Sequence, residues 1–276
     1  MKKGKFLLKL ATALAAVTLG LVTVTTTPAS AKTVTFGTTG VSYPTSYKKG
    51  KQLTGYDVAV TKAASKKLGY KVKYKTTSFG SLFGQLDSHK VDGIASNLAI
   101  TPQRKQKYLF SRSYADLKYG VAVSKKSKIK NINQLRHKTL GATEGSLVGP
   151  VMLARYLSHN KVSESVGDAN VKQAKKYINI KTYDDRESVI NAVNNGQVDG
   201  YVNAEAVFKA TIKHDNLPLK LISGHFGGEN IGLAFNKNSK GRQLQKNYNK
   251  ALQQLQKDGT LSRLSKKYFA GDDVTR

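Results

Sequence analysis

Two stretches of the chain resemble each other 107 residues apart, and this internal repeat constrains the fold more than any other feature. Residues 82–94 read LFGQLDSHKVDGI, and residues 189–201 read VINAVNNGQVDGY. Each has the apolar spacing of a short helix, then a polar turn, then Val-Asp-Gly opening a segment typical of a buried strand. Two copies predict two similar α/β lobes in one chain. Clefts between domains are preferred sites for small ligands, so we expect a site between the lobes.

The first 31 residues have the pattern of a secretory signal peptide. Lysines at positions 2, 3, 5 and 9 precede an uncharged apolar run from Leu10 to Val24, and Ala29-Ser30-Ala31 supplies an A-x-A cleavage site. The alternative is a membrane anchor. Threonines interrupt the apolar run and Pro28 follows it, which fits cleavage better. We therefore expect a secreted protein.

The chain contains no cysteine. It therefore has no disulfide, no thiolate zinc site and no cysteine for lipid attachment after the signal. We expect neither a metal nor a cofactor.

Positive charge dominates the composition, with 46 Lys and Arg against 17 Asp and Glu and a formal net charge of +29. Such a charge indicates an anionic partner. For an exported protein we expect a cell-wall polymer, anionic lipid heads or host glycans, which would hold the protein electrostatically at the cell surface. We expect no nucleic acid, because no RNP, zinc-finger or helix-turn-helix signature accompanies the lysines. A solvated surface without a specific partner remains the alternative.

Strands alternate with helices along the rest of the chain, which predicts an α/β protein. A helix is expected to open at Gly55-Tyr56-Asp57 and to stop at Gly69. Tyr119 to Ser124 is expected to be a strand that crosses to the second lobe. Gly224 to Asn230 is expected to be a loose glycine-rich turn on the return, followed by a strand from Ile231 to Asn236.

The segment SNLAITPQR, residues 96–104, is the sharpest site candidate. It follows a buried strand and runs into a helix, whose first backbone N–H groups attract an anion. Arg104 can bind a carboxylate through two parallel hydrogen bonds. The turn Glu144–Leu147 corresponds to it in the second lobe and adds the Ser146 hydroxyl. Together the two helix starts predict a carboxylate site across the cleft.

Catalytic motifs are missing from the sequence. It has no G-x-S-x-G, no H-E-x-x-H and no P-loop, and its five histidines are scattered in polar contexts. Asp92 and Asp199, in the two Val-Asp-Gly motifs, are expected to cap turns. We therefore expect a binding protein and not an enzyme.

In this order, the motifs resemble the family 3 extracellular solute-binding proteins of amino-acid ABC importers, and among them basic surface-associated members from Gram-positive bacteria. The resemblance covers nearly all of residues 33–269. It rests on GYDV at 55–58, VDGI at 91–94, ITPQR at 100–104, FSRSY at 110–114, NGQVD at 195–199, IGLAF at 231–235, DGTL at 258–261 and KYF at 267–269.

The resemblance implies an α/β fold of the two-lobed periplasmic-binding-protein kind, type II, with two hinge strands and closure on the ligand. After the signal peptide of residues 1–31, lobe 1 would comprise residues 32–121 and 227–276. Lobe 2 would comprise residues 122–226. The receptor would act as a monomer with a permease and an ATPase on separate chains.

The resemblance also implies roles for the pocket residues. Tyr43 and Phe79 would lie against the ligand side chain, and Arg104 and Ser146 would take its carboxylate. Backbone groups of Ser96, Asn97 and Ala99 would approach the ligand.

Three positions depart from the family pattern. The family usually has Ser or Thr at Ala99, often Thr at Leu147, and Asp at Ala204, where the acid pairs with the ligand ammonium. Losing one buried ionic partner costs about 2–5 kcal/mol if nothing compensates. Asn203 and Glu205, on either side of Ala204, are candidates to compensate.

Three hypotheses stay open. The protein binds an amino acid, polar or cystine-like, with Asn203 or Glu205 replacing the missing acid. Alternatively, it binds a carboxylate or peptide-like compound without a free amine there. In the third, the transport pocket has relaxed and the basic surface serves adhesion to wall polymers, mucin or matrix.

Overall fold

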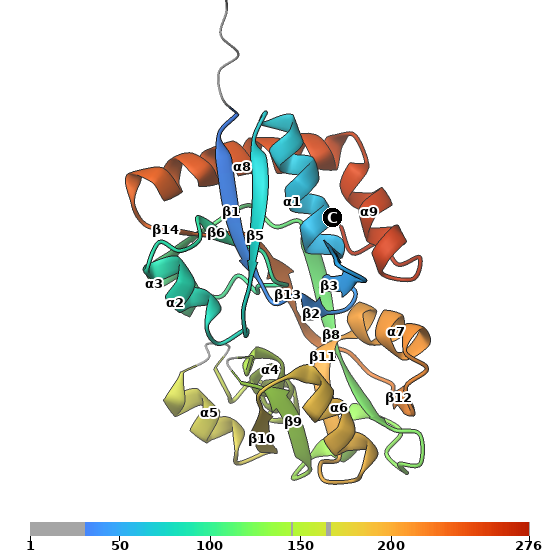
Figure 1. The fold of residues 1–276 in the computed structure, drawn as a ribbon. Coiled ribbons are helices and arrows are strands. Elements are labelled where there is room, and N and C mark those ends of the chain that lie inside the picture. Colours follow the sequence, from blue (N-terminus) through green and yellow to red (C-terminus); the bar gives the residue numbers. More distant parts are fainter. Residues whose placement is uncertain (1–30, 145, 164–166, 276) are drawn as a thin grey trace, which may run out of the picture. The chain divides into compact units, whose positions relative to one another are not determined.

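The computed structural model describes residues 31–144, 146–163 and 167–275, and Figure 1 shows their fold. The expected signal peptide lies outside the described residues except for Ala31. Within the described ranges, no helix combines the length and the apolar character needed to cross a membrane.

Among the described residues, the strands form two large sheets and one small one. Sheet 1 has the order β5-β1-β6-β14-β7, sheet 2 the order β10-β9-β11-β8-β12 with β13 paired to β8, and the small sheet the order β2-β3-β4. The strands of sheet 1 are β1 Thr33–Thr38, β5 Lys71–Thr76, β6 Gly93–Ile94, β7 Tyr108–Phe110 and β14 Ala234–Asn236. The strands of sheet 2 are β8 Ala115–Ser124, β9 Thr139–Thr143, β10 Asn179–Tyr183, β11 Gly200–Ala204, β12 Leu219–Leu221 and β13 Phe226–Ile231. The small sheet contains β2 Val41–Ser42, β3 Ser46–Lys49 and β4 Gln52–Thr54.

Helices connect these strands, as parallel pairing requires. Those of lobe 1, around sheet 1, are α1 Tyr56–Lys67, α2 Leu82–Asp87, α3 Pro102–Lys107, α8 Ser239–Lys257 and α9 Thr260–Tyr268. Those of lobe 2, around sheet 2, are the 3-10 helix η1 Ile132–Leu135 and α4 Val148–Leu157, α5 Asp168–Ala174, α6 Arg186–Asn194 and α7 Glu205–His214. Two lobes of mixed α/β structure confirm the expected fold class (Figure 1).

An aromatic cluster marks the core of lobe 1. Phe36 of β1 meets Tyr248 of α8 edge-on, with ring centroids 5.3 Å apart, and Phe235 of β14 lies 6.2 Å from Phe36. All three side chains are fully buried. Helix α8 is thereby fixed on the strands that lead to the candidate site.

The predicted first helix is confirmed as α1, and Gly69 follows its end. Its start needs glycine, because Gly55 has φ +121° and a Cβ there would lie 2.3 Å from the carbonyl oxygen of Thr45. The chain before α1 therefore packs tightly against the loop between β2 and β3. That loop carries Tyr43, one of the expected ligand residues.

The sequence repeat corresponds to a structural repeat. The Asp92 carboxylate accepts a 2.8 Å hydrogen bond from the backbone N–H of Thr35, and the Asp199 carboxylate accepts one of the same length from Thr139. In return, the backbone N–H of each aspartate donates to the carbonyl oxygen of the same threonine, at 2.8 and 2.7 Å. Each Val-Asp-Gly thus binds the neighbouring strand of its own lobe. Both aspartates have a structural role, although they bind a strand and not a turn.

Strands β8 and β13 run beside each other as an antiparallel pair, from Ala115 opposite Ile231 to Tyr119 opposite Phe226. The expected crossing strand therefore begins earlier than Tyr119. The prediction of a loose turn at Gly224 to Asn230 is wrong, because most of it is strand β13. The strand expected at Ile231 to Asn236 is β14, which is shorter. The residue limits given above for the two lobes remain a prediction.

Candidate functional site

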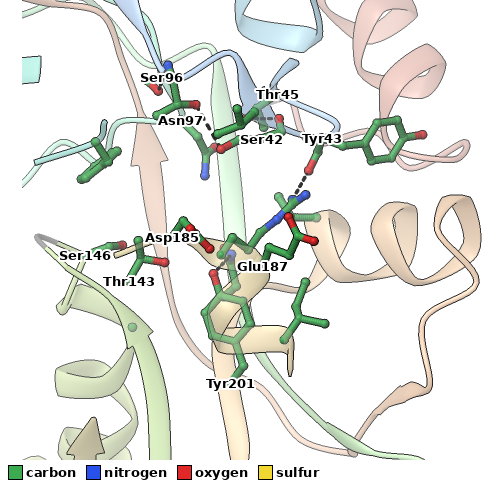
Figure 2. A pocket seen from close by; sticks show the side chains of 18 of the residues that line it. Ser42, Tyr43, Thr45, Ser96, Asn97, Thr143, Ser146, Asp185, Glu187 and Tyr201 are labelled. Carbon is green, nitrogen blue, oxygen red and sulfur yellow. Dashed lines mark hydrogen bonds between the residues drawn. The ribbon is translucent and has the colours of Figure 1, made fainter. Parts of the chain in front are cut away.

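A cavity of about 850 Å³ lies between elements of the two lobes. Its size suits a small molecule. Figure 2 shows Ser42, Thr45, Ser96 and Asn97 on one side and Thr143, Ser146, Asp185 and Tyr201 on the other. Eight of the eleven expected ligand residues line it: Tyr43, Phe79, Ser96, Asn97, Ala99, Arg104, Ser146 and Asn203. The other three, Leu147, Ala204 and Glu205, are not in the lining.

A buried carboxylate holds the loop after β6 in place. The backbone N–H of Asn97 donates to Asp57 at 2.6 Å, and the Tyr114 hydroxyl donates to the other carboxylate oxygen at 2.7 Å. Burial raises the pKa of Asp57 to about 7, although both hydrogen bonds lower it. Asn97 itself has the left-handed backbone angle φ +48°. Asp57 therefore fixes the loop that presents Ser96 and Asn97 to the cavity.

Arg104 comes from the first turn of α3. The Thr101 hydroxyl caps this helix by accepting a 3.1 Å hydrogen bond from the backbone N–H of Arg104. The guanidinium donates to the carbonyl oxygen of Ala99 at 3.0 Å and lies over the rings of Phe79 and Phe83, at 5.9 and 5.6 Å from their centroids. Burial lowers the pKa of Arg104, and the nearby negative charge of Glu229 opposes this. An arginine stays charged even so, which makes this position suited to an anionic group.

Glu229 on β13 is a cavity residue that sequence reasoning missed. Its carboxylate accepts a short hydrogen bond from the Tyr119 hydroxyl on β8. Burial raises the pKa of Glu229 to about 7, while this hydrogen bond and the charge of Arg104 lower it. Its one signal in the sequence is that Glu229 is the single acid in the glycine-rich return segment, for which the composition predicts a turn.

Lobe 2 supplies a more polar wall. Ser146, which follows β9, lines the cavity, and the neighbouring Leu147 is the N-terminal cap residue of α4. The Asn203 amide donates to the Tyr201 hydroxyl at 2.9 Å and accepts from the backbone N–H of Ala204 at 2.7 Å. Asn203 therefore already has partners within its own lobe.

Ala204 and Glu205 both lie away from the cavity. Ala204 is fully buried in a hydrophobic cluster that includes Val207 of α7. The Glu205 carboxylate lies 3.0 Å from Lys209 and 3.0 Å from His225. The structure thus places neither residue where it could meet a group bound beside Arg104.

Tyr43 connects two sides of the cavity lining. Arg186, at the start of α6, donates a short hydrogen bond to the carbonyl oxygen of Tyr43. The Thr211 hydroxyl of α7 donates to the same oxygen at 3.4 Å. The Tyr43 ring stacks on His214, with centroids 4.0 Å apart, and Figure 2 shows it turned away from Ser96 and Asn97. Tyr43 thereby joins the small sheet to lobe 2.

Exposed acidic side chains also line the cavity. Asp184, Asp185, Glu187 and Asp215 are all exposed members of this wall. Asp185 caps α6 by accepting a 2.7 Å hydrogen bond from the backbone N–H of Ser188, and hydrogen bonding to Ser188 lowers its pKa.

Comparison with known proteins places this geometry in a family. The model of bacterial extracellular solute-binding proteins, family 3, matches residues 34–271. The probable amino-acid-binding protein YxeM of Bacillus subtilis (strain 168) is 40% identical over 240 residues, which cover 87% of this chain and 84% of YxeM.

Two solved structures share the fold. An ancestral arginine-binding protein bound to arginine is 29% identical with a TM-score of 0.70, covering 86% of this chain and 98% of that one. A structure on glutathione import in Gram-positive bacteria via GshT and the cystine ABC importer TcyBC of Streptococcus mutans is 30% identical with a TM-score of 0.73, covering 89% and 98%.

Proposed function

Because the chain belongs to the bacterial extracellular solute-binding proteins, family 3, we propose that it binds a free α-amino acid in the cavity between its lobes and delivers it to an ABC importer. Membership of this family makes it a receptor and not an enzyme. The relatives differ in the ligands that their names give, among them arginine and cystine, so the family by itself does not select a ligand.

The observation that carries the proposal is Arg104. Its guanidinium is largely buried at the cavity wall and fixed by the carbonyl oxygen of Ala99 and the rings of Phe79 and Phe83. A pre-oriented guanidinium loses little side-chain freedom on binding, which favours planar recognition of a carboxylate. Ser146, on the opposite wall, is a further donor for the same group.

Thermal unfolding of residues 32–276 against the twenty amino acids, L-cystine and small carboxylates tests this proposal. A ligand that binds only the folded state raises the midpoint temperature. We expect one amino acid or a few related ones to do so. A protein whose midpoint no amino acid moves is not an amino-acid receptor.

Calorimetric titration of Arg104→Ala then tests the residue. Removing one partner of a buried charge pair costs about 2–5 kcal/mol, or roughly 30- to several-thousand-fold in affinity. The matched control is Arg112→Ala, which removes an exposed guanidinium that contacts Gln256 at 3.1 Å outside the cavity. Equal affinity of Arg104→Ala and Arg112→Ala would refute the carboxylate role.

We further propose that the basic surface holds the secreted protein at the cell by electrostatic attraction to anionic wall polymers. The support is the net charge of +29, of which about +25 remains without the four signal lysines. Salt screens such attraction, so washing cells in about 1 M salt should release the protein. Retention in that wash would indicate a specific anchor instead. Salt-sensitive binding to mucin that survives Arg104→Ala would favour the adhesion hypothesis.

A further inference from the structure

We propose that Glu229 binds the α-ammonium group of the ligand, with Tyr119 as the residue that orients it. This inference rests on the proposed function, because it assumes a ligand that carries both a carboxylate and an ammonium. The part of the site that binds the ammonium then lies on strand β13. Neither Asn203 nor Glu205 takes part in it.

The first argument is position. An α-amino acid carries its ammonium and its carboxylate on the same carbon atom, so its receptor needs a cation and an anion close together in one cavity. Arg104 and Glu229 both line this cavity, and each is near enough for its charge to influence the pKa of the other. The remaining acids of the lining, unlike the partly buried Glu229, are exposed to solvent: Asp184, Asp185, Glu187 and Asp215.

The second argument is preparation of the carboxylate. Glu229 is partly buried and accepts a hydrogen bond from Tyr119, which holds one orientation of the side chain. A desolvated carboxylate interacts strongly with a cation, and a fixed one loses little entropy on binding. Partial burial keeps some of the hydrogen-bond donors of water away from the Glu229 carboxylate. The ammonium of a ligand would replace them with its own donors and its positive charge.

The third argument is the backbone that carries it. Gly228 lies so close to β8 that a Cβ would stand 3.0 Å from the carbonyl oxygen of Leu117. The pairing of β13 with β8 is irregular between Phe226 and Gly228, next to Glu229. Such irregularities re-aim side chains at the edge of a ladder, and here the re-aimed side chain points to the cavity.

The proposal links binding to a proton. Because burial raises the pKa of Glu229 to about 7, its carboxyl is partly protonated at neutral pH in the free protein. An ammonium favours the ionised form, so binding should release a proton, and affinity should fall as pH falls below about 7. The titratable and charged groups that face Glu229 are Arg104 of α3, Tyr119 of β8 and Tyr201 of β11. The two tyrosines and the arginine titrate well above this range, so they do not produce the same dependence.

The test compares each of the twenty amino acids and L-cystine with its N-acetyl derivative, which keeps the carboxylate and side chain but has no ammonium. The wild-type protein should prefer the free amino acid. Glu229→Gln keeps the shape and the Tyr119 hydrogen bond, and it should lose about 30-fold or more in affinity for the free form. Its affinity for the N-acetyl form should not fall. The control Asp258→Asn removes an exposed carboxylate that pairs with Lys67 outside the cavity, and it should behave like the wild type.

A second measurement needs no variant. Titration of the wild type in buffers of different ionisation enthalpy should show proton release, with affinity falling by up to about tenfold per pH unit below the pKa of Glu229. Tyr119→Phe should shift this pH profile, which a purely structural role of Tyr119 would not do.

The outcomes are distinct. A wild type that binds no free amino acid overturns both this inference and the proposed function. A wild type that binds one, together with a Glu229→Gln variant that keeps the same affinity and preference, overturns this inference alone. Loss of stability in Glu229→Gln with unchanged preference would mean that Glu229 is a structural partner of Tyr119 and Arg104.

Discussion

Replacing Asp57 by asparagine should remove the part of the pH dependence of stability that comes from the burial of this carboxyl group beside the cavity. Asp57 is fully buried in α1 and holds the Asn97 backbone and the Tyr114 hydroxyl. Burial raises its pKa to about 7 from the ordinary 3.8. An asparagine of nearly the same shape is neutral at every pH and can still accept a hydrogen bond.

The sign follows from linkage. The folded state holds the Asp57 proton to a higher pH than the unfolded chain does, so its contribution to stability is complete below about pH 4 and is lost as pH rises through about 7. The two pKa values differ by about three, and each unit corresponds to about 1.4 kcal/mol. The free energy of unfolding of Asp57→Asn, minus that of the wild type, should therefore rise by about 4 kcal/mol between about pH 4 and pH 8.

Urea unfolding of both proteins at intervals over this range measures the difference. The large positive charge of the chain also makes stability depend on pH, but it is common to both proteins and largely cancels in the difference. Asp184→Asn, which removes an exposed carboxylate at the cavity, shows what the loss of one charge alone contributes. Parallel profiles for wild type and Asp57→Asn would refute the reasoning, since they would mean that Asp57 ionises as readily folded as unfolded.

Two further substitutions test the surroundings of the cavity. Gly55→Ala should destabilise by about 2–5 kcal/mol in urea unfolding, because its Cβ would meet the Thr45 carbonyl oxygen at 2.3 Å and its φ is +121°. Gly50→Ala, with φ +60° and open space around the new Cβ, should cost only about 1–2 kcal/mol, and an equal cost at both glycines would contradict the clash. Arg186→Ala should remove the charged donor to the Tyr43 carbonyl, worth about 1.5–3 kcal/mol, and favour an open form with a larger radius of gyration in small-angle scattering. An unchanged radius in the unliganded variant would show that this contact does not hold the lobes together.

The local parts of this fold could be read from the sequence. The helix from Tyr56 and the two Val-Asp-Gly units follow from apolar spacing, a glycine stop and a short repeat, all of which act over a few residues. The segment around Arg104 was identifiable for the same reason, since Thr101 and Pro102 mark a helix start directly beside it.

The pairing of strands that lie far apart in the sequence could not be predicted in this way. Glycine-rich composition at Gly224 to Asn230 favours a turn, and β13 forms only because β8, more than 100 residues away, provides a ladder for it. The direction of Glu205 is equally non-local. Lys209 is the i+4 neighbour of Glu205 within α7, but the other partner, His225, comes from the segment before β13 and depends on how α7 packs against it.

These two failures of sequence reasoning concern one question, which is where the partner of the ligand ammonium comes from. Ala204 is buried among apolar side chains, so the site gains packing there and no charge. A carboxylate at position 204 would stand in these apolar surroundings, where burial would raise its pKa and weaken the ionised form that an ammonium needs. An alanine at position 204 and a glutamate at position 229 are therefore consistent with each other. We therefore infer that the ammonium partner missing from position 204 of β11 is supplied by Glu229 of β13, which belongs to the same sheet.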